Sequence, residues 1–201
     1  MTRIYARKDA KILEAAEELF LRDGYAATSM TAVAGRAGVA KQTLYSNFPS
    51  KEELFSSVVG RRSVRAMEPA AELDVDHGGL ESTLTELGVA FLSHIYSTEQ
   101  VELFRTGVAE SRQFPELGAK MIDGPFLETP STIEAFLRAR VERGELDLPD
   151  VEFGTAMFTS LLKADVHRRL LFNQPADTSP ATIRRIATQA VHLFLRGAAT
   201  R

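Results

Sequence analysis

Apolar residues recur every three to four positions along almost the whole of this 201-residue chain. That spacing places them on one face of an α-helix. The pattern starts with Ile12, Leu13, Ala16, Leu19 and Phe20, and it closes with Ile183, Ile186, Ala190, Leu193 and Phe194. The chain shows no alternating strand pattern bounded by hairpin turns, and no repeat period. The sequence therefore predicts an all-α protein of about ten helices.

Polar caps and glycines indicate where the first helices begin and end. The first helix is expected to stop at Asp23-Gly24, and Thr28-Ser29 is expected to cap a second. A third, short helix is predicted from about Ala40 to Ser46. Ser50-Lys51-Glu52-Glu53 has the Ser-x-x-Glu form of a capping box, which predicts a fourth helix ending near Pro69.

Charge is distributed unevenly along the chain. The net charge is −3, yet residues 1–66 hold 11 Lys and Arg against 7 Asp and Glu, while the rest holds 13 against 20. This asymmetry suggests a basic N-terminal module on an acidic body, with chance as the alternative explanation. We expect two domains, over residues 7–66 and 67–201.

Several kinds of chemistry are excluded or disfavoured by composition. The chain has no Cys, so it has no disulfide, thiolate metal site or Cys nucleophile. Its four His show no metal-binding spacing, and no phosphate loop or nucleophile elbow occurs. We therefore expect no metal, no cofactor and no enzymatic activity. No apolar run approaches the roughly 20 residues of a membrane span, and no secretory signal is evident, so a cytoplasmic protein without a membrane partner is expected.

Residues 29–51 hold the pattern most informative about function. Two short helical segments are joined by a tight turn at Gly38, a residue that tolerates positive φ. This arrangement is typical of a helix-turn-helix, whose second helix enters the major groove of DNA. The small core behind the motif is expected to contain Val33, Ala37, Val39, Leu44 and Phe48.

The side chains left over from that core can hydrogen-bond base edges or phosphates. We expect base edges to be contacted or bordered by Lys41, Gln42, Thr43 and Asn47, and phosphates by Ser29, Thr31, Tyr45 and Lys51. Lys51 lies in the first turn of the fourth helix, where backbone N–H groups and an ammonium together suit an anion. Double-stranded operator DNA is the predicted partner.

Residues from about 7 to 66 resemble the DNA-binding domain of the TetR family of transcriptional regulators. The matching segments are Ile12-Leu13-Glu14-Ala15-Ala16-Glu17-Glu18-Leu19-Phe20, Gly24-Tyr25, Ala27-Thr28-Ser29, Ala37-Gly38-Val39, Thr43-Leu44-Tyr45 and Asn47-Phe48-Pro49-Ser50-Lys51-Glu52-Glu53-Leu54. The resemblance implies that Thr43-Leu44-Tyr45 belong to the recognition helix, and that Tyr45 and Lys51 hold phosphates. The chain departs from the family at Ala32-Val33-Ala34, where an acid is more common.

The C-terminal part resembles the AefR-like type of TetR C-terminal domain. The segments concerned are Ala109-Glu110-Ser111-Arg112-Gln113-Phe114-Pro115-Glu116-Leu117, Gly124-Pro125 and Gly144-Glu145-Leu146. This resemblance implies dimerisation through the last two helices and a small-molecule pocket. Aromatic and Met side chains beside a few polar groups are typical of such pockets. We expect an apolar or amphipathic effector near Phe91, His94, Phe104, Arg105, Glu110, Met121, Phe126 and Met157.

A homodimer is expected because one helix-turn-helix covers only half of a palindromic site. The final helices, predicted over residues 150–172 and 179–196, carry enough apolar surface for a four-helix interface. Candidate interface residues are Phe158, Leu162, Val191 and Phe194, with the core of a single chain as the alternative position.

The sequence thus predicts a ligand-responsive repressor that binds a palindromic operator as a homodimer and is released by a small molecule. Two alternatives remain open. One is an activator or a ligand-independent regulator on the same fold. The other is an all-α enzyme or interaction protein whose N-terminal motif has no DNA-binding role.

Overall fold

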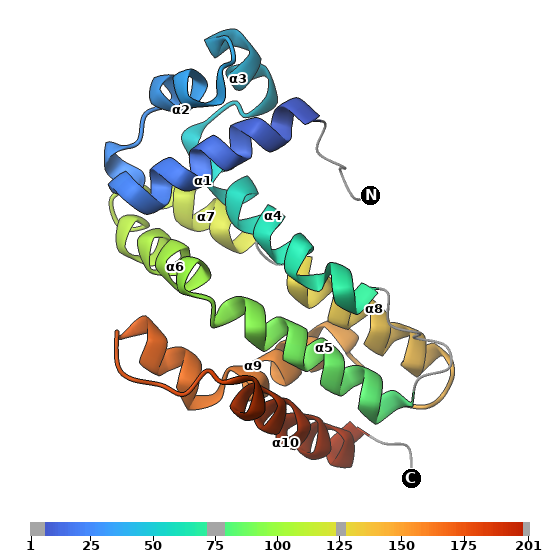
Figure 1. Ribbon diagram of the computed structural model, residues 1–201. Helices are drawn as coiled ribbons and strands as arrows, with labels where there is room; N and C mark the ends of the chain where they lie inside the picture. Colours follow the sequence, from blue (N-terminus) through green and yellow to red (C-terminus); the bar gives the residue numbers. More distant parts are fainter. Residues whose placement is uncertain (1–6, 72–78, 124–127, 199–201) are drawn as a thin grey trace. The chain divides into compact units, whose positions relative to one another are not determined.

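The computed structural model describes residues 7–71, 79–123 and 128–198, and these residues form ten helices with no strand among them (Figure 1). The predicted all-α fold is confirmed. The helices are α1 Arg7–Ala27, α2 Met30–Ala37, α3 Lys41–Asn47, α4 Lys51–Ala71, α5 Leu80–Ile95, α6 Thr98–Glu110, α7 Pro115–Asp123, α8 Glu128–Glu142, α9 Val151–Leu171 and α10 Pro180–Ala198. Within the described part of the chain, no helix has the length and apolar character of a membrane span.

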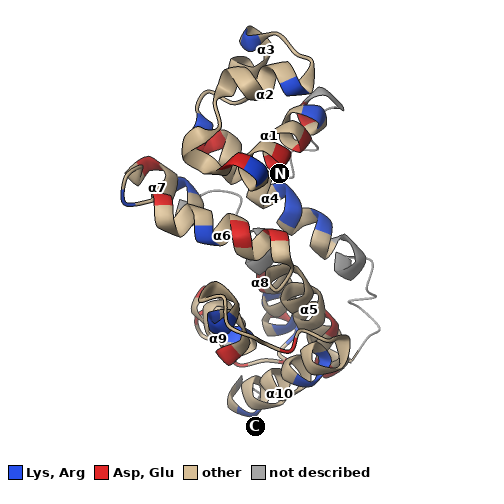
Figure 2. Cartoon of the chain, turned by 60° about the vertical axis from the view of Figure 1, so that its left-hand side comes forward, with Lys and Arg blue, Asp and Glu red and all other residues tan. Residues whose placement is uncertain are grey.

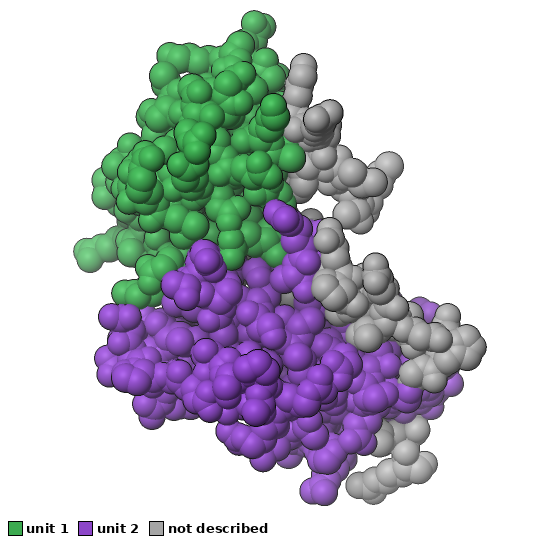
Figure 3. All heavy atoms as spheres, in the orientation of Figure 1, with its two compact units in different colours: residues 1–62, 102–127 green, residues 63–101, 128–201 purple. Residues whose placement is uncertain are grey.

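The chain divides into two compact units (Figure 3). Unit 1 comprises residues 1–62 and 102–127, and unit 2 comprises residues 63–101 and 128–201. Helices α4 and α6 each contribute residues to both units. Residues 102–127 belong to the same compact unit as the helix-turn-helix, although the sequence assigns them to the C-terminal domain.

Unit 1 is organised around an aromatic cluster. The Phe20 and Phe55 rings lie 5.0 Å apart, and Tyr25 lies 5.4 Å from Phe55 and 5.3 Å from Phe114. Tyr25 and Phe55 are fully buried. Leu117 from α7 joins the same core. The α6–α7 segment is therefore part of the hydrophobic core that supports the DNA-binding module.

Two arginines of α4 attach that helix to α1 within unit 1. The Arg61 guanidinium donates to the Ala10 carbonyl and to Glu17, both at 3.1 Å. Arg62 also forms an ion pair with Glu17. Only 7% of Arg61 is exposed. These side chains link α1 and α4.

Unit 2 packs α5, α8, α9 and α10 around one core. Packing is tight at Gly88, where an added methyl group would lie 3.1 Å from Leu162 Cδ2 and 3.3 Å from Ala187 Cβ. Asp150 caps α9, because its carboxylate accepts a hydrogen bond from the Phe153 N–H at 2.9 Å. Glycine at position 88 thus allows α5 to pack against both C-terminal helices.

Candidate nucleic-acid interface

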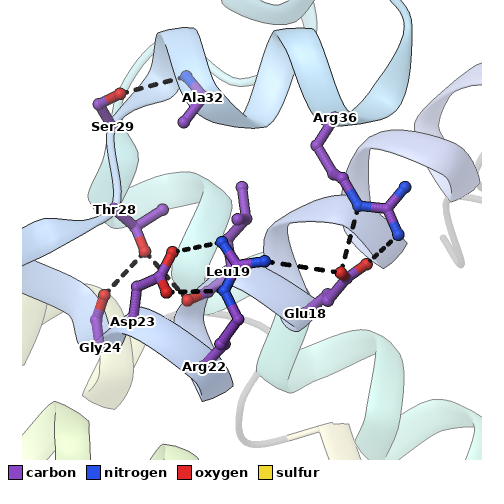
Figure 4. A network of polar contacts seen from close by, with 9 residues as sticks. All are labelled: Glu18, Leu19, Arg22, Asp23, Gly24, Thr28, Ser29, Ala32 and Arg36. Carbon is purple, nitrogen blue, oxygen red and sulfur yellow. Dashed lines mark hydrogen bonds and ion pairs between the residues drawn. The ribbon is translucent and has the colours of Figure 1, made fainter.

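The start of α2 is fixed by the chain segment that leaves α1. Gly24 has a φ of +80°, which breaks the helical path of α1 as predicted. The Thr28 hydroxyl contacts the Gly24 carbonyl at 2.7 Å and the Leu19 carbonyl at 3.2 Å (Figure 4). Ser29 then caps α2 by accepting the Ala32 N–H at 3.1 Å. The Ser29 hydroxyl still has a proton that it can donate.

The predicted turn between α2 and α3 is present at Gly38. Its φ is +67°, in the left-handed region, and its N–H bonds the Gly35 carbonyl at 3.3 Å. Val33, Leu44 and Phe48 are buried behind the turn, with Ala37 and Val39 packed partly against them. The predicted core of the helix-turn-helix is therefore confirmed.

The predicted base- and phosphate-contacting side chains lie on α3 and at the start of α2. Lys41, Gln42 and Tyr45 are exposed on α3, while Thr43 and Asn47 are partly buried on the same helix. Ser29 and Thr31 are exposed at the N-terminus of α2. Tyr45 is 48% exposed, so nearly half of its surface is open to solvent.

This surface carries no negative charge. No Asp or Glu occurs from Gly24 to Lys51, and Figure 2 shows α2 and α3 free of acidic residues. Arg36 is committed to an ion pair with Glu18 of α1 at 2.5 Å (Figure 4). Lys41 makes no hydrogen bond or ion pair within the described residues. An acid-free surface with a lysine available suits a phosphate backbone.

Lys51 is bound inside unit 1. Its ammonium donates to the carbonyls of Tyr25 at 2.8 Å, Thr28 at 3.0 Å and Ala26 at 3.4 Å. It also lies 4.1 Å from the centroid of the Tyr25 ring. Burial lowers the pKa of Lys51, although nearby carboxylates oppose this effect. These contacts use all three donors, so the geometry differs from that of the phosphate clamp expected from sequence.

The Tyr25 side chain extends this contact to the start of α4. Its hydroxyl donates to Glu52 Oε1 at 2.7 Å, and burial together with that carboxylate raises the pKa of Tyr25. Its ring packs on Phe114, which precedes α7. One buried tyrosine thus joins the α1–α2 connection, α4 and the α6–α7 segment. No local sequence pattern indicates this junction, because its parts lie far apart in the chain.

The predicted effector residues are divided between the two units. Phe91 and His94 are buried on α5 in unit 2, with His94 3.1 Å from Ser63 Oγ. Met157 is exposed on α9. The unit 1 candidates are Phe104, Arg105, Glu110 and Met121, and Phe126 lies outside the described residues. The structure therefore does not gather the predicted residues within one unit.

Two individual candidates have clear structural roles. Met121 is buried in the unit 1 core, where an added methyl group at Gly107 would lie 2.8 Å from its Cε. Arg105 pairs with Glu102 at 3.1 Å along the exposed side of α6. A surface hollow of about 290 Å³ also lies on α8, between Glu134 and Glu142. It contains none of the predicted residues.

The predicted dimer-interface residues need correction. Phe158, Leu162 and Val191 are fully buried, Phe194 is 9% exposed, and the Phe158 and Phe194 rings lie 5.0 Å apart in the unit 2 core. Side chains buried within a protomer are not available to a second one. Among the described residues, the large apolar side chains exposed on the same two helices are those of Phe153, Met157 and Leu193. Helical periodicity alone does not show which apolar residues of α9 and α10 are buried in the protomer and which are exposed.

Two family models match successive parts of the chain. Residues 12–58 match the N-terminal domain of bacterial regulatory proteins of the tetR family. Residues 82–197 match the C-terminal domain of AefR-like transcriptional repressors. The chain belongs to the TetR family of bacterial transcriptional regulators.

Individual relatives match over different lengths. The transcriptional activator FasR of Mycolicibacterium smegmatis is 47% identical over 51 residues, which are 25% of this chain and 23% of FasR. The chain spans about a third or less of the length of the curated relatives that it matches first. These matches support DNA binding by a regulator and do not extend to the whole proteins.

Solved structures match over nearly the full chain. A TetR-family regulator from Mesorhizobium loti is 27% identical, with a TM-score of 0.79 and coverage of 100% of both chains. The flavonoid-responsive regulator FrrA is 28% identical, with a TM-score of 0.72, covering 97% of this chain and 98% of FrrA. The fold is thus that of a TetR-family regulator.

Proposed function

We propose that the protein represses transcription by binding a palindromic operator as a homodimer and leaves the DNA when a small effector binds. The observation that carries this proposal is the exposed polar face of α3, with Lys41, Gln42 and Tyr45 on an acid-free helix-turn-helix. Amide and basic side chains at such a position suit base edges and phosphates in a major groove. The protein acts in the cytoplasm and performs no enzymatic step.

We propose that the dimer forms through α9 and α10. Two-fold pairing would present two α3 helices to successive major grooves about 34–36 Å apart. Phe153, Met157 and Leu193 are the apolar side chains that support this face, because they are 63%, 44% and 61% exposed in the single chain. Exposed apolar residues gathered on two helices favour an interface between protomers.

Release by an effector is supported by the way the units share helices. Helices α4 and α6 contribute to both units, so a ligand in unit 2 that favours one position of either helix changes the DNA-binding module. Such coupling typically changes operator affinity by roughly 5–150-fold. FrrA is flavonoid-responsive, and flavonoids are accordingly the first class of compound to screen.

Activation is the alternative that a specific comparison favours, since FasR is an activator. The same helix-turn-helix serves either outcome, because the position of the operator relative to the promoter decides between them. The AefR-like C-terminal match favours repression.

Fluorescence anisotropy with the intergenic DNA upstream of the gene tests the proposal. We expect salt-dependent binding that is at least about 10³-fold tighter than binding to scrambled DNA. A transcription assay with and without the protein then separates repression from activation. Equal affinity for cognate and scrambled DNA at every salt concentration would contradict the proposed function.

A further inference from the structure

Helix α2 is held in unit 1 by few buried side chains. It is eight residues long, and its buried residues are Met30, Val33 and Ala34. Gly35 has no side chain, and nothing lies within 4 Å of the position that a Cβ atom would take there. Helices in proteins are stabilised mainly by the packing of their apolar face. Polar contacts with α1 are therefore the other means of fixing where this short helix lies.

Two polar contacts attach α2 to consecutive residues of α1 (Figure 4). Just before α2 begins, the Thr28 hydroxyl lies 3.2 Å from the Leu19 carbonyl. In the last turn of α2, Arg36 makes a two-point contact with Glu18. Its Nε donates to Glu18 Oε1 at 3.2 Å, and its Nη2 lies 2.5 Å from Glu18 Oε2. Because these contacts lie at the two ends of α2, together they restrict both rotation and sliding of the helix on α1.

The contact between Arg36 and Glu18 suits positioning better than stabilisation. Their side chains are 55% and 43% exposed. Ion pairs at such exposure add little to the free energy of folding, because water screens the charges and both side chains lose conformational freedom. A guanidinium that meets both oxygens of a carboxylate fixes direction as well as distance. The contact therefore defines the geometry of α2 on α1 at little gain in stability.

The turn at Gly38 passes the position of α2 on to α3. The Gly38 N–H donates to the Gly35 carbonyl at 3.3 Å, and the Val39 N–H donates to the Ala34 carbonyl at 3.0 Å. Helix α3 begins two residues later, at Lys41. A shift of α2 on α1 therefore shifts α3, which carries the side chains expected to contact base edges.

We propose that Arg36 is a positioning residue for DNA recognition, whose contact with Glu18 sets the angle at which α3 meets the major groove. The inference rests on the proposed operator binding and adds a residue that determines specificity without contacting DNA. Hydrogen bonds to base edges weaken steeply when they are misaligned. Attraction to phosphates carries no sequence information and tolerates small shifts. Loss of the contact should therefore weaken binding to cognate DNA and leave binding to scrambled DNA nearly unchanged.

Anisotropy titrations of the full-length protein with the upstream intergenic DNA and with a scrambled sequence test this inference. Arg36→Met should reduce the ratio of the two affinities by about fivefold or more, as loss of one base contact does. The salt slope should stay the same, and Tm should fall by no more than about 2–4 °C. Arg22→Met is the matched control, because Arg22 pairs with Glu18 and Asp23 within α1. That variant should leave the affinity ratio unchanged.

Exchange of the two charges separates position from charge. A protein with both Glu18→Arg and Arg36→Glu regains an ion pair between α1 and α2, so its affinity ratio should return to within about threefold of wild type. A ratio that stayed at the level of Arg36→Met would contradict the inference.

Two results for Arg36→Met alone would also overturn it. If both affinities fell equally and the salt slope fell by about one unit, Arg36 would contact a phosphate. An unchanged ratio with intact cognate binding would leave the proposed function standing without this role for Arg36. If wild-type protein showed no preference for cognate DNA, the proposed function itself would fail, and the inference with it.

Discussion

The Lys51 ammonium donates to the Tyr25 carbonyl at 2.8 Å while lying 4.1 Å from the centroid of the same residue's ring. A single side chain at the start of α4 thus holds both the backbone and the aromatic face of the α1–α2 connection. That connection determines where Ser29 caps α2, and the Phe114 ring lies 5.3 Å from the Tyr25 ring. We interpret Lys51 as a residue that positions the helix-turn-helix.

Lys51→Met should therefore lower the stability of the protein. It should leave the electrostatic contribution to DNA binding unchanged. We expect a loss of about 1 kcal/mol after allowance for solvent screening, or about 2–4 °C in Tm for a chain of this size. The slope of log affinity against log salt should remain unchanged. Differential scanning calorimetry and anisotropy titrations between 50 and about 200 mM salt provide the two readouts.

Lys41→Met is the matched control for Lys51. Lys41 is exposed on α3, so its loss should leave Tm unchanged and reduce the salt slope by about one unit. If the salt slope also fell by one unit in Lys51→Met, Lys51 would contact a phosphate, as expected from the sequence.

Gln42→Ala should reduce specificity. Its exposed amide on α3 can make a bidentate contact with a base edge worth about 1–3 kcal/mol of discrimination. We expect cognate affinity to fall by roughly 5–150-fold with little change for scrambled DNA. Gln113→Ala provides the control, because Gln113 is exposed outside the helix-turn-helix. If the affinities for cognate and scrambled DNA fell equally, Gln42 would contact the phosphate backbone instead of a base edge.

Features that depend on neighbouring residues were predictable from the sequence. The Ser29 cap, the positive φ of Gly38 and the Asp150 cap each depend on a few consecutive positions. Backbone sterics and capping chemistry act over that range, so the residue types alone specify the geometry. The helix-turn-helix core followed for the same reason, since helical periodicity places Val33 and Leu44 on one side.

Features that depend on distant contacts were not predictable. Lys51 meets carbonyls 23 to 26 residues earlier in the chain, which no local pattern indicates. Phe158 and Phe153 are both apolar positions of α9, yet the first is buried and the second is 63% exposed. Packing of α9 on α5 and α10 decides between them, and periodicity does not contain that information.

Two glycines should respond in opposite directions to added side-chain volume. At Gly88, valine would overpack against Leu162 and Ala187, at a cost of about 1–3 kcal/mol. At Gly35 in α2, nothing lies within 4 Å of an added methyl group, so Gly35→Ala should gain about 0.5–1 kcal/mol. Urea unfolding curves measure both changes. A stable Gly88→Val protein would contradict the close packing of α5 against α9 and α10.

Leu193→Glu and Phe153→Glu should convert a dimer into a monomer without unfolding the chain. Both side chains are exposed in the protomer, so a carboxylate there remains hydrated until a second protomer covers it. Sedimentation at micromolar concentration should give about 44 kDa for wild type and half of that for each variant. Ile122→Glu, at a site on α7 that is 67% exposed, should leave the mass of the dimer unchanged. Wild-type mass for both α9 and α10 variants would place the interface elsewhere.

His167 should make the protein sensitive to acid. Burial and the charge of Lys163 lower the pKa of His167 to about 4 in the folded state, against about 6.5 in an unfolded chain. Between these values the unfolded chain binds a proton that the folded chain does not bind, so stability is lost as pH falls from about 6.5 to 4. His167→Gln should remove this part of the acid dependence, and Lys163→Met should reduce it by raising the pKa of His167. Thermal melts at intervals between pH 7.5 and about 4.5 span most of that window. Parallel Tm profiles for wild type and His167→Gln would show that the imidazole is solvated in the folded protein.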